Sequence, residues 1–194
     1  YEISTAIQES VNVSVSGADD DNIYINNQRV ASDTAAKIAL NQSEIKVVRI
    51  IVQNGEKQPV YAYLKLVPDD VKAAEQVEEL IDAIGDVTLD SYDDITAART
   101  AYDKLSDNAK TLVENYETLT AAEEALAKAE ADVISNAIKA IDAIGKVTAD
   151  SKDKIEKAKD AYSAVPERLR DKVTNSDTLD KATERFAVID TIKQ

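Results

Sequence analysis

The sequence predicts a multidomain β + α protein in a chain of 194 residues. Two observations support this fold class. The spacing of apolar residues changes near Pro68 from every second residue to a helical period of about 3.6 residues. The segment that follows contains an internal repeat, in which positions 81–127 correspond without a gap to positions 141–187. We expect an antiparallel β-sandwich over residues 1–68, then two tandem three-helix bundles, over residues 69–130 and 131–194, that share one long helix.

The N-terminal part has the alternating pattern of half-buried strands. In residues 11–16 each Val is followed by a polar residue, and residues 45–52 hold a β-branched run that suits a central strand. A further strand is expected over residues 60–67. Asn54-Gly55 lies between the last two runs and accepts the positive φ angles of a type I′ turn, so we expect a hairpin there. Five or six short strands with turn signals favour an antiparallel sandwich.

Helices are expected from Val71 onward. Pro68 tends to end a strand, and Asp69 or Asp70 can cap the helix that follows. Apolar residues then recur with the spacing of core-facing helix stripes. These stripes are Val71, Ala74, Val77, Ile81 and Ile84; Ile95, Ala98, Tyr102 and Leu105; and Leu119, Ala122, Leu126, Ala129, Val133, Ala137, Ile141 and Ile144.

The internal repeat supplies the expected helix ends. Asp82-Ala83-Ile84-Gly85 recurs without a gap at residues 142–145. We expect Gly85 and Gly145 to provide the left-handed residue that ends a helix. Asp90 and Asp150 precede the next stripe in each copy and are expected to cap it. Each copy is therefore interpreted as a three-helix module.

One predicted helix joins the two modules. Residues 118–144 contain no Gly or Pro, and their apolar stripe has no stop signal. At 1.5 Å per residue this helix would be about 40 Å long. A shared helix is stiffer than a Gly/Ser linker, which favours a spacer function.

Composition excludes several classes of function. The formal net charge is −14, so a nucleic-acid partner or an anionic membrane surface is not expected. The chain has no His and no Cys, so zinc, haem, thiol and His-base chemistries lose their usual residues. No apolar run approaches the ~20 residues of a membrane span. No nucleophile, phosphate-loop or dinucleotide motif occurs, so we predict no catalytic residues, no cofactor and no enzyme activity.

Two clusters are candidate binding sites, each with a plainer alternative. Asp19, Asp20 and Asp21 could hold Ca²⁺ in a loop, but their spacing is not that of an EF-hand, and a solvated acidic turn is the alternative. Tyr61 and Tyr63 face one side of a predicted strand and could stack on a sugar. The alternative is an ordinary half-buried sheet face, and the lack of Trp counts against a dedicated carbohydrate site.

The helical half resembles a known class of repeats. The first copy contains Val87-Thr88, Ala101-Tyr102-Asp103 and Leu105-Ser106-Asp107 after the segment that ends at Gly85. Residues 81–127 and 141–187 resemble the tandem three-helix repeats, FIVAR-like in style, of large surface proteins of Gram-positive bacteria. The second copy departs from this pattern at Val165-Pro166-Glu167, which affects one helix cap.

The N-terminal half resembles the cadherin-like and immunoglobulin-like β-sandwiches of bacterial surface proteins. Residues 23–30, 38–52 and 60–67 carry this resemblance, with Asn27 where Gly is usual and with the first strand expected to be missing before Tyr1.

Both resemblances imply an extracellular location, at the bacterial cell surface or secreted. The chain begins at Tyr1, so we expect a processed or excised part of a larger protein. The implied function is a non-catalytic spacer that displays neighbouring modules or mediates adhesion to a host protein or glycan. The alternative is a glycan- or protein-binding ancillary region of a secreted glycoside hydrolase.

Overall fold

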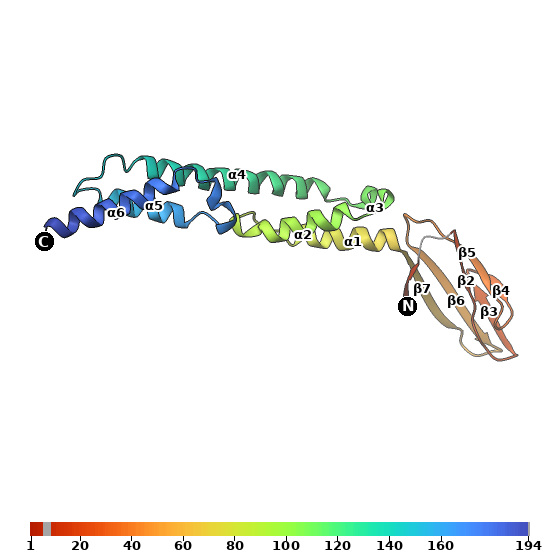
Figure 1. Cartoon of the computed structure of the whole chain (residues 1–194). Coiled ribbons are helices and arrows are strands. Elements are labelled where there is room, and N and C mark those ends of the chain that lie inside the picture. Colours follow the sequence, from red (N-terminus) through yellow and green to blue (C-terminus); the bar gives the residue numbers. More distant parts are fainter. Residues whose placement is uncertain (6–8, 194) are drawn as a thin grey trace. The chain divides into compact units, whose positions relative to one another are not determined.

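The chain folds into a β part followed by helices (Figure 1). The structure is a computed structural model that describes residues 1–5 and 9–193. A five-stranded sheet and a two-stranded sheet form the β part. The strands of the described residues are β1 (Glu2–Thr5), β2 (Ser10–Val13), β3 (Asp21–Ile25), β4 (Gln28–Val30), β5 (Ala36–Ala39), β6 (Lys46–Asn54) and β7 (Val60–Pro68).

The larger sheet has the strand order β1-β7-β6-β3-β4, and β2 pairs with β5 in the smaller one. The predicted hairpin is confirmed, because β6 and β7 are antiparallel. The type I′ turn expected at Asn54-Gly55 is not formed, because Gly55 has a positive φ of 53° but Asn54, the last residue of β6, does not. The prediction that the strands are all antiparallel is wrong, because β1 runs parallel to β7. A parallel pair needs a long connection, and here almost the whole β part separates the two strands. Alternation along a single strand cannot reveal that pairing.

The core of the β part lies between the two sheets. Val13 and Ile38 of the smaller sheet form one buried cluster with Ile25, Val48 and Leu66 of the larger sheet. Successive side chains of a strand point to opposite faces, so one face of each sheet contributes to this core.

The helical part follows directly on β7. Its elements in the described residues are α1 (Asp69–Asp82), η1 (Leu89–Ser91), α2 (Tyr92–Asp103), α3 (Asp107–Leu112), α4 (Tyr116–Asp142), α5 (Lys152–Ser163), η2 (Glu167–Lys172) and α6 (Ser176–Lys193). The long helix expected over residues 118–144 is present as α4, which has 27 residues. None of the helices in the described residues is long and apolar enough to cross a membrane.

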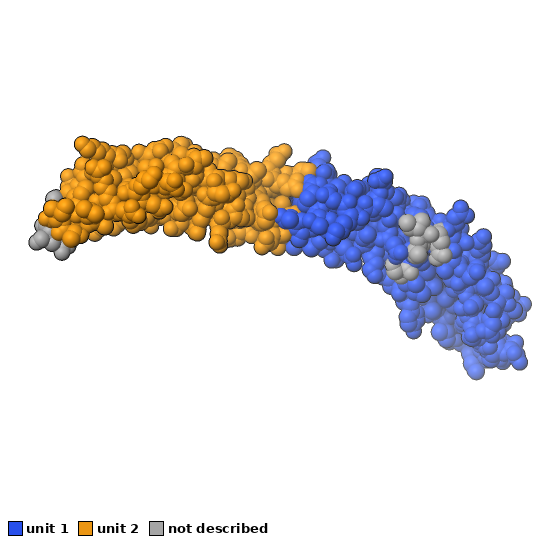
Figure 2. Space-filling view, in the orientation of Figure 1, with its two compact units in different colours: residues 1–83, 96–119 blue, residues 84–95, 120–194 orange. Residues whose placement is uncertain are grey.

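The chain divides into two compact units (Figure 2). The first comprises residues 1–83 and 96–119, and the second comprises residues 84–95 and 120–194. The second unit has its own buried core, formed by Ala137, Ile141, Ile144, Val147, Ile155, Ala158, Val165, Leu169, Val173, Leu179 and Ala182. The three domains expected from the sequence stay a prediction.

Candidate functional site

The internal repeat is reproduced in side-chain contacts. The amide nitrogen of Asn115 donates hydrogen bonds to the backbone oxygen of Glu78 (3.1 Å) and to the carboxylate of Asp82 (2.8 Å). Asn175, its counterpart in the second copy, makes the same pair of bonds to α4, at 3.0 and 2.8 Å. In both copies this Asn connects the start of one helix to the end of another. The sequence repeat is therefore also a repeat of structure.

Asp90 does not have the capping role expected from the sequence. The N-cap of η1 is Thr88, whose hydroxyl accepts a hydrogen bond from the backbone nitrogen of Asp90 (3.2 Å). The hydroxyl of Ser91 completes this capping box by accepting from the backbone nitrogen of Thr88 (3.0 Å). The prediction is wrong because a short 3-10 turn precedes α2 and moves the cap upstream to Thr88.

The second copy repeats this arrangement. The hydroxyl of Thr148 accepts from the backbone nitrogen of Asp150 (3.4 Å), and Ser151, not Asp150, is the N-cap residue of α5. Gly85 and Gly145 follow the ends of α1 and α4 with φ angles of 59° and 60°. A side chain is strained in that left-handed region, so Gly suits both turns.

A buried or half-buried acid stands at the equivalent position before each copy of the repeat, at Asp70 and at Glu130. Asp70, before the first copy, is 8% exposed. It does not cap α1, whose N-cap is Pro68. Its two carboxylate oxygens accept from the hydroxyl of Ser106 (2.8 Å) and from the amide of Asn108 (2.7 Å). Asp70 thereby joins α1 to the start of α3.

Asn108 also contacts the β part. Its side-chain oxygen accepts a hydrogen bond from the hydroxyl of Ser43 (3.2 Å), in the loop between β5 and β6. This contact lies within the first compact unit. A single side chain thus connects its own repeat to the segment that precedes that repeat.

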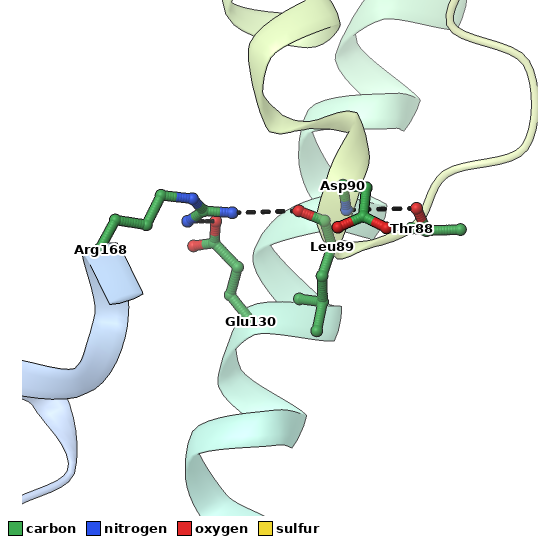
Figure 3. A network of polar contacts seen from close by, with 5 residues as sticks. All are labelled: Thr88, Leu89, Asp90, Glu130 and Arg168. Atoms are coloured by element: carbon green, nitrogen blue, oxygen red, sulfur yellow. Dashed lines mark hydrogen bonds and ion pairs between the residues drawn. The ribbon is translucent and has the colours of Figure 1, made fainter. Parts of the chain in front are cut away.

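The second copy replaces this polar pair with an ion pair (Figure 3). Glu130 and Arg168 are the counterparts of Asp70 and Asn108 in the repeat, and the Arg168 guanidinium donates to the Glu130 carboxylate. The other guanidinium nitrogen donates to the backbone oxygen of Leu89 (3.3 Å). The guanidinium carbon lies 3.9 Å from the ring centroid of Tyr92, a cation–π contact. We call this group of contacts around Arg168 the junction clamp.

The junction clamp forms one wall of a pocket of about 620 Å³. Glu167 and Pro166 line it together with Asp90, Asp93, Tyr92, Leu89 and Arg168. All of these residues belong to the second unit, although Leu89 to Asp93 lie in the first copy of the repeat. The cation in this wall is the Arg168 guanidinium, which already contacts Glu130, Leu89 and Tyr92. These contacts support a role for Arg168 in linking segments of the chain better than a role in binding a substrate.

The sequence did not indicate the junction clamp, because both charged partners look like ordinary surface residues. The side chains of Arg168 and Glu130 are 27% and 19% exposed. The repeat aligns the acid at position 70 with the acid at position 130, and this correspondence is the signal that could have indicated the clamp.

The acidic loop near residue 20 is organised by hydrogen bonds. The Asp21 carboxylate accepts from the backbone nitrogen of Ala18 (2.8 Å) and from the amide of Asn54 (2.9 Å). Asp19 and Asp20 are exposed and flank this turn. Among the described residues, no group of three or more acidic side chains is placed to hold a metal ion. The contacts of Asp21 therefore support a structural role.

The hydrogen bonds of Asp21 and Asp33 predict that the stability of the fold depends on pH. The hydrogen bond from Asn54 lowers the pKa of Asp21, and the hydroxyls of Ser16 and Ser32 lower the pKa of Asp33. A lowered pKa in the folded state means that the unfolded chain binds protons more readily. The stabilisation is therefore present above about pH 4 and is lost as pH falls through the lowered pKa values. Urea unfolding from pH 5 to pH 2 should show a shallower acid dependence for Asp21→Asn/Asp33→Asn than for the unaltered chain.

Tyr61 and Tyr63 lie on β7, and each is 55% exposed. They alternate with the half-buried Ala62 and Leu64, so both rings are on the same face of the larger sheet, as predicted. Their use as a ligand site stays a prediction.

A second aromatic cluster belongs to the first copy alone. The rings of Tyr102 and Tyr116 stack with centroids 4.4 Å apart, and Arg99 lies over both at 5.6 and 5.3 Å. The equivalent of Tyr116 in the second copy is Ser176, so the second copy has no such stack. The two copies thus share the hydrogen bonds made by Asn115 and Asn175 and differ in aromatic packing.

No family model, curated protein or solved structure matches this chain.

Proposed function

We propose that this chain is a non-catalytic spacer of a surface or secreted bacterial protein, in which two three-helix bundles extend from an immunoglobulin-like sandwich. In this proposal it separates neighbouring modules by a fixed distance. The observation that carries it is the combination of an unbroken helix with a clamp where the second repeat follows the first.

The unbroken helix supports stiffness. α4 has 27 residues, about 40 Å of helix at 1.5 Å per residue. Buried residues lie near its start, at Leu119, Ala122 and Leu126, and near its end, at Ala137 and Ile141, whereas residues 127–136 are exposed or half-buried. The helix therefore packs against other elements at both ends, which stabilises it far beyond its intrinsic propensity.

The junction clamp supports the same proposal. It gives α4 a polar contact to the loop before α2 and to the start of η2, through Glu130, Leu89 and Arg168. Three contacts on one guanidinium restrict that loop more than a single surface ion pair would. A segment designed for flexible display would be expected to have Gly and Ser at this place.

A distance measurement tests the spacer. The chain has no Cys, so Gln76→Cys and Lys181→Cys, both at exposed helix positions, can carry a dye pair. Single-molecule energy transfer should give one narrow distance distribution. It should widen when the helix is broken by Ala127→Pro and stay narrow in the matched variant Ala127→Ser. A broad distribution in the unaltered chain would contradict the spacer function.

Loss of the clamp cation should weaken the second unit. Arg168→Ala leaves the half-buried Glu130 without its ion pair and removes the contact to Tyr92. We expect a loss of about 1–3 kcal/mol in the free energy of unfolding. Chemical denaturation of Arg168→Ala, Glu130→Gln and the double variant forms a cycle that measures the coupling. If the losses in unfolding free energy of the two single variants add up to that of the double variant, the Arg168–Glu130 pair has no interaction energy, which would contradict the prediction.

A further inference from the structure

The larger sheet has an outer face that the smaller sheet does not cover. The strand ladders fix which side chains share it. Tyr24 is paired with Arg29 of β4 on one side and with Ile51 on the other, and Ile51 is paired with Tyr61. In the next row Arg49 is paired with Tyr63, and beyond it Lys65 lies opposite Glu2. We define the outer face by Tyr24, Arg29, Arg49, Tyr61, Tyr63 and Lys65, and the apolar Val47 and Ile51 lie on the same side.

The opposite face of the same strands is packed. Ile25, Val48 and Leu66 belong to the buried cluster shared with the smaller sheet. The outer face instead leaves Tyr61 and Tyr63 each 55% exposed. Their positions two residues apart on one strand put the two ring bases about 7 Å apart. Large exposed rings on one sheet face suggest that this face contacts a ligand.

The outer face is positive in an acidic protein. The chain has a net charge of −14, yet the ladders place Arg29, Arg49 and Lys65 on this face with Glu2 as its carboxylate. Glu2 and Lys65 form an ion pair of 3.1 Å whose side chains are 57% and 42% exposed. Exposed ion pairs of this kind contribute little stabilisation, so Lys65 can leave Glu2 and bind an anionic group of a ligand instead.

Two of the three rings on this face have a cation as their ladder partner, which determines what fits it. Tyr63 is paired with Arg49 and Tyr24 with Arg29, whereas Tyr61 is paired with the apolar Ile51. A ligand that fits this face offers C–H surface next to anionic groups. Charged sugars joined in a chain have both properties, because a pyranose ring stacks on an aromatic ring and its carboxylate accepts from a guanidinium.

We propose that the outer face binds an acidic polysaccharide whose sugars carry carboxylates. Carboxylated sugars fit better than heavily sulfated ones, because the surrounding net charge of −14 repels a ligand of high charge density. The rings of Tyr61 and Tyr63 would contact sugar faces, and Arg29, Arg49 and Lys65 would bind carboxylates. This interaction surface is additional to the spacer function and does not depend on it.

Titration calorimetry with the full chain and hyaluronan tests this proposal. We expect binding that weakens as salt rises, and an affinity at least tenfold lower for Tyr61→Ala/Tyr63→Ala. Arg29→Gln/Lys65→Gln should lose affinity to a similar extent. Val188→Ala/Ile192→Ala, which changes two exposed apolar residues of α6, is the matched control and should bind normally. Thermal unfolding should show that all three variants remain folded.

Three further probes separate the alternatives. Neutral dextran should not bind, because it offers no anion to the cations of the outer face. Poly-L-glutamate binding as tightly as hyaluronan would overturn the proposal by showing plain charge capture. Binding of heparin without binding of hyaluronan would overturn the choice of carboxylated sugars. Absence of hyaluronan binding at millimolar concentration would overturn the proposal as a whole.

Discussion

Ala127→Pro should lower the free energy of unfolding by about 3 kcal/mol or more. Ala127 lies in the middle of α4, and its side chain is exposed, so the substitution removes no core contact. Proline lacks the backbone N–H that bonds to the carbonyl one helical turn earlier, and its ring clashes with that carbonyl. The kink would fall in the turn before residue 127, between the buried residues Ala122 and Leu126. Calorimetry should show one transition splitting into two.

The matched control is Ala127→Gly at the same exposed position. Glycine keeps the backbone hydrogen bond and should cost only about 1 kcal/mol. Unfolding that stays in one transition for the glycine variant and splits for the proline variant would show that helix continuity joins the repeats. Equal effects of the two substitutions would contradict that explanation.

Ile141→Ala should cost about 2–5 kcal/mol, because it opens a cavity in the core of the second unit. Ile141 is 0% exposed and belongs to that buried cluster. Its equivalent in the first copy is Ile81, which is 1% exposed and lies in the first unit. Ile81→Ala should therefore cause a loss of the same size.

Hydrogen exchange can distinguish where each variant is weakened. Ile141→Ala should increase exchange in α5 and α6, and Ile81→Ala should increase it in α1 and α3. An equal increase throughout the chain for both variants would show that the two units unfold as one. The exposed control Ile192→Ala should change stability by less than about 0.5 kcal/mol.

The sequence allowed good prediction of those elements whose signals are local. Asn54-Gly55 indicated the β6–β7 hairpin, and the uninterrupted stripe through residues 118–144 indicated α4. The parallel pairing of β1 with β7 could not be predicted, because it joins the first and last strands of the β part. Residue type alone indicates Asp90 and Asp150 as the caps, whereas a 3-10 turn gives that role to Thr88 in the first copy.

The candidate sites follow the same division. The common side of Tyr61 and Tyr63 follows from their spacing on one strand and could be predicted. The presence of Tyr24, Arg29 and Arg49 on that face depends on strand order and register, which one strand's pattern does not contain. Likewise, the contact of Arg168 with Leu89 joins residues 79 positions apart and needs the folded chain.

The equivalent positions 108 and 168 hold different residues, Asn and Arg, and this difference has an evolutionary consequence. Duplication of a gene segment copies every contact inside a module, and the identical bonds of Asn115 and Asn175 show that such contacts were kept. The surface that meets the preceding segment must instead be adapted to a new neighbour. Asn108 meets a serine hydroxyl of the β part, whereas Arg168 meets a backbone oxygen and an aromatic ring. One codon thus adjusts a copied module to whatever precedes it, which allows a gene to gain length by duplication without redesign of the module's interior.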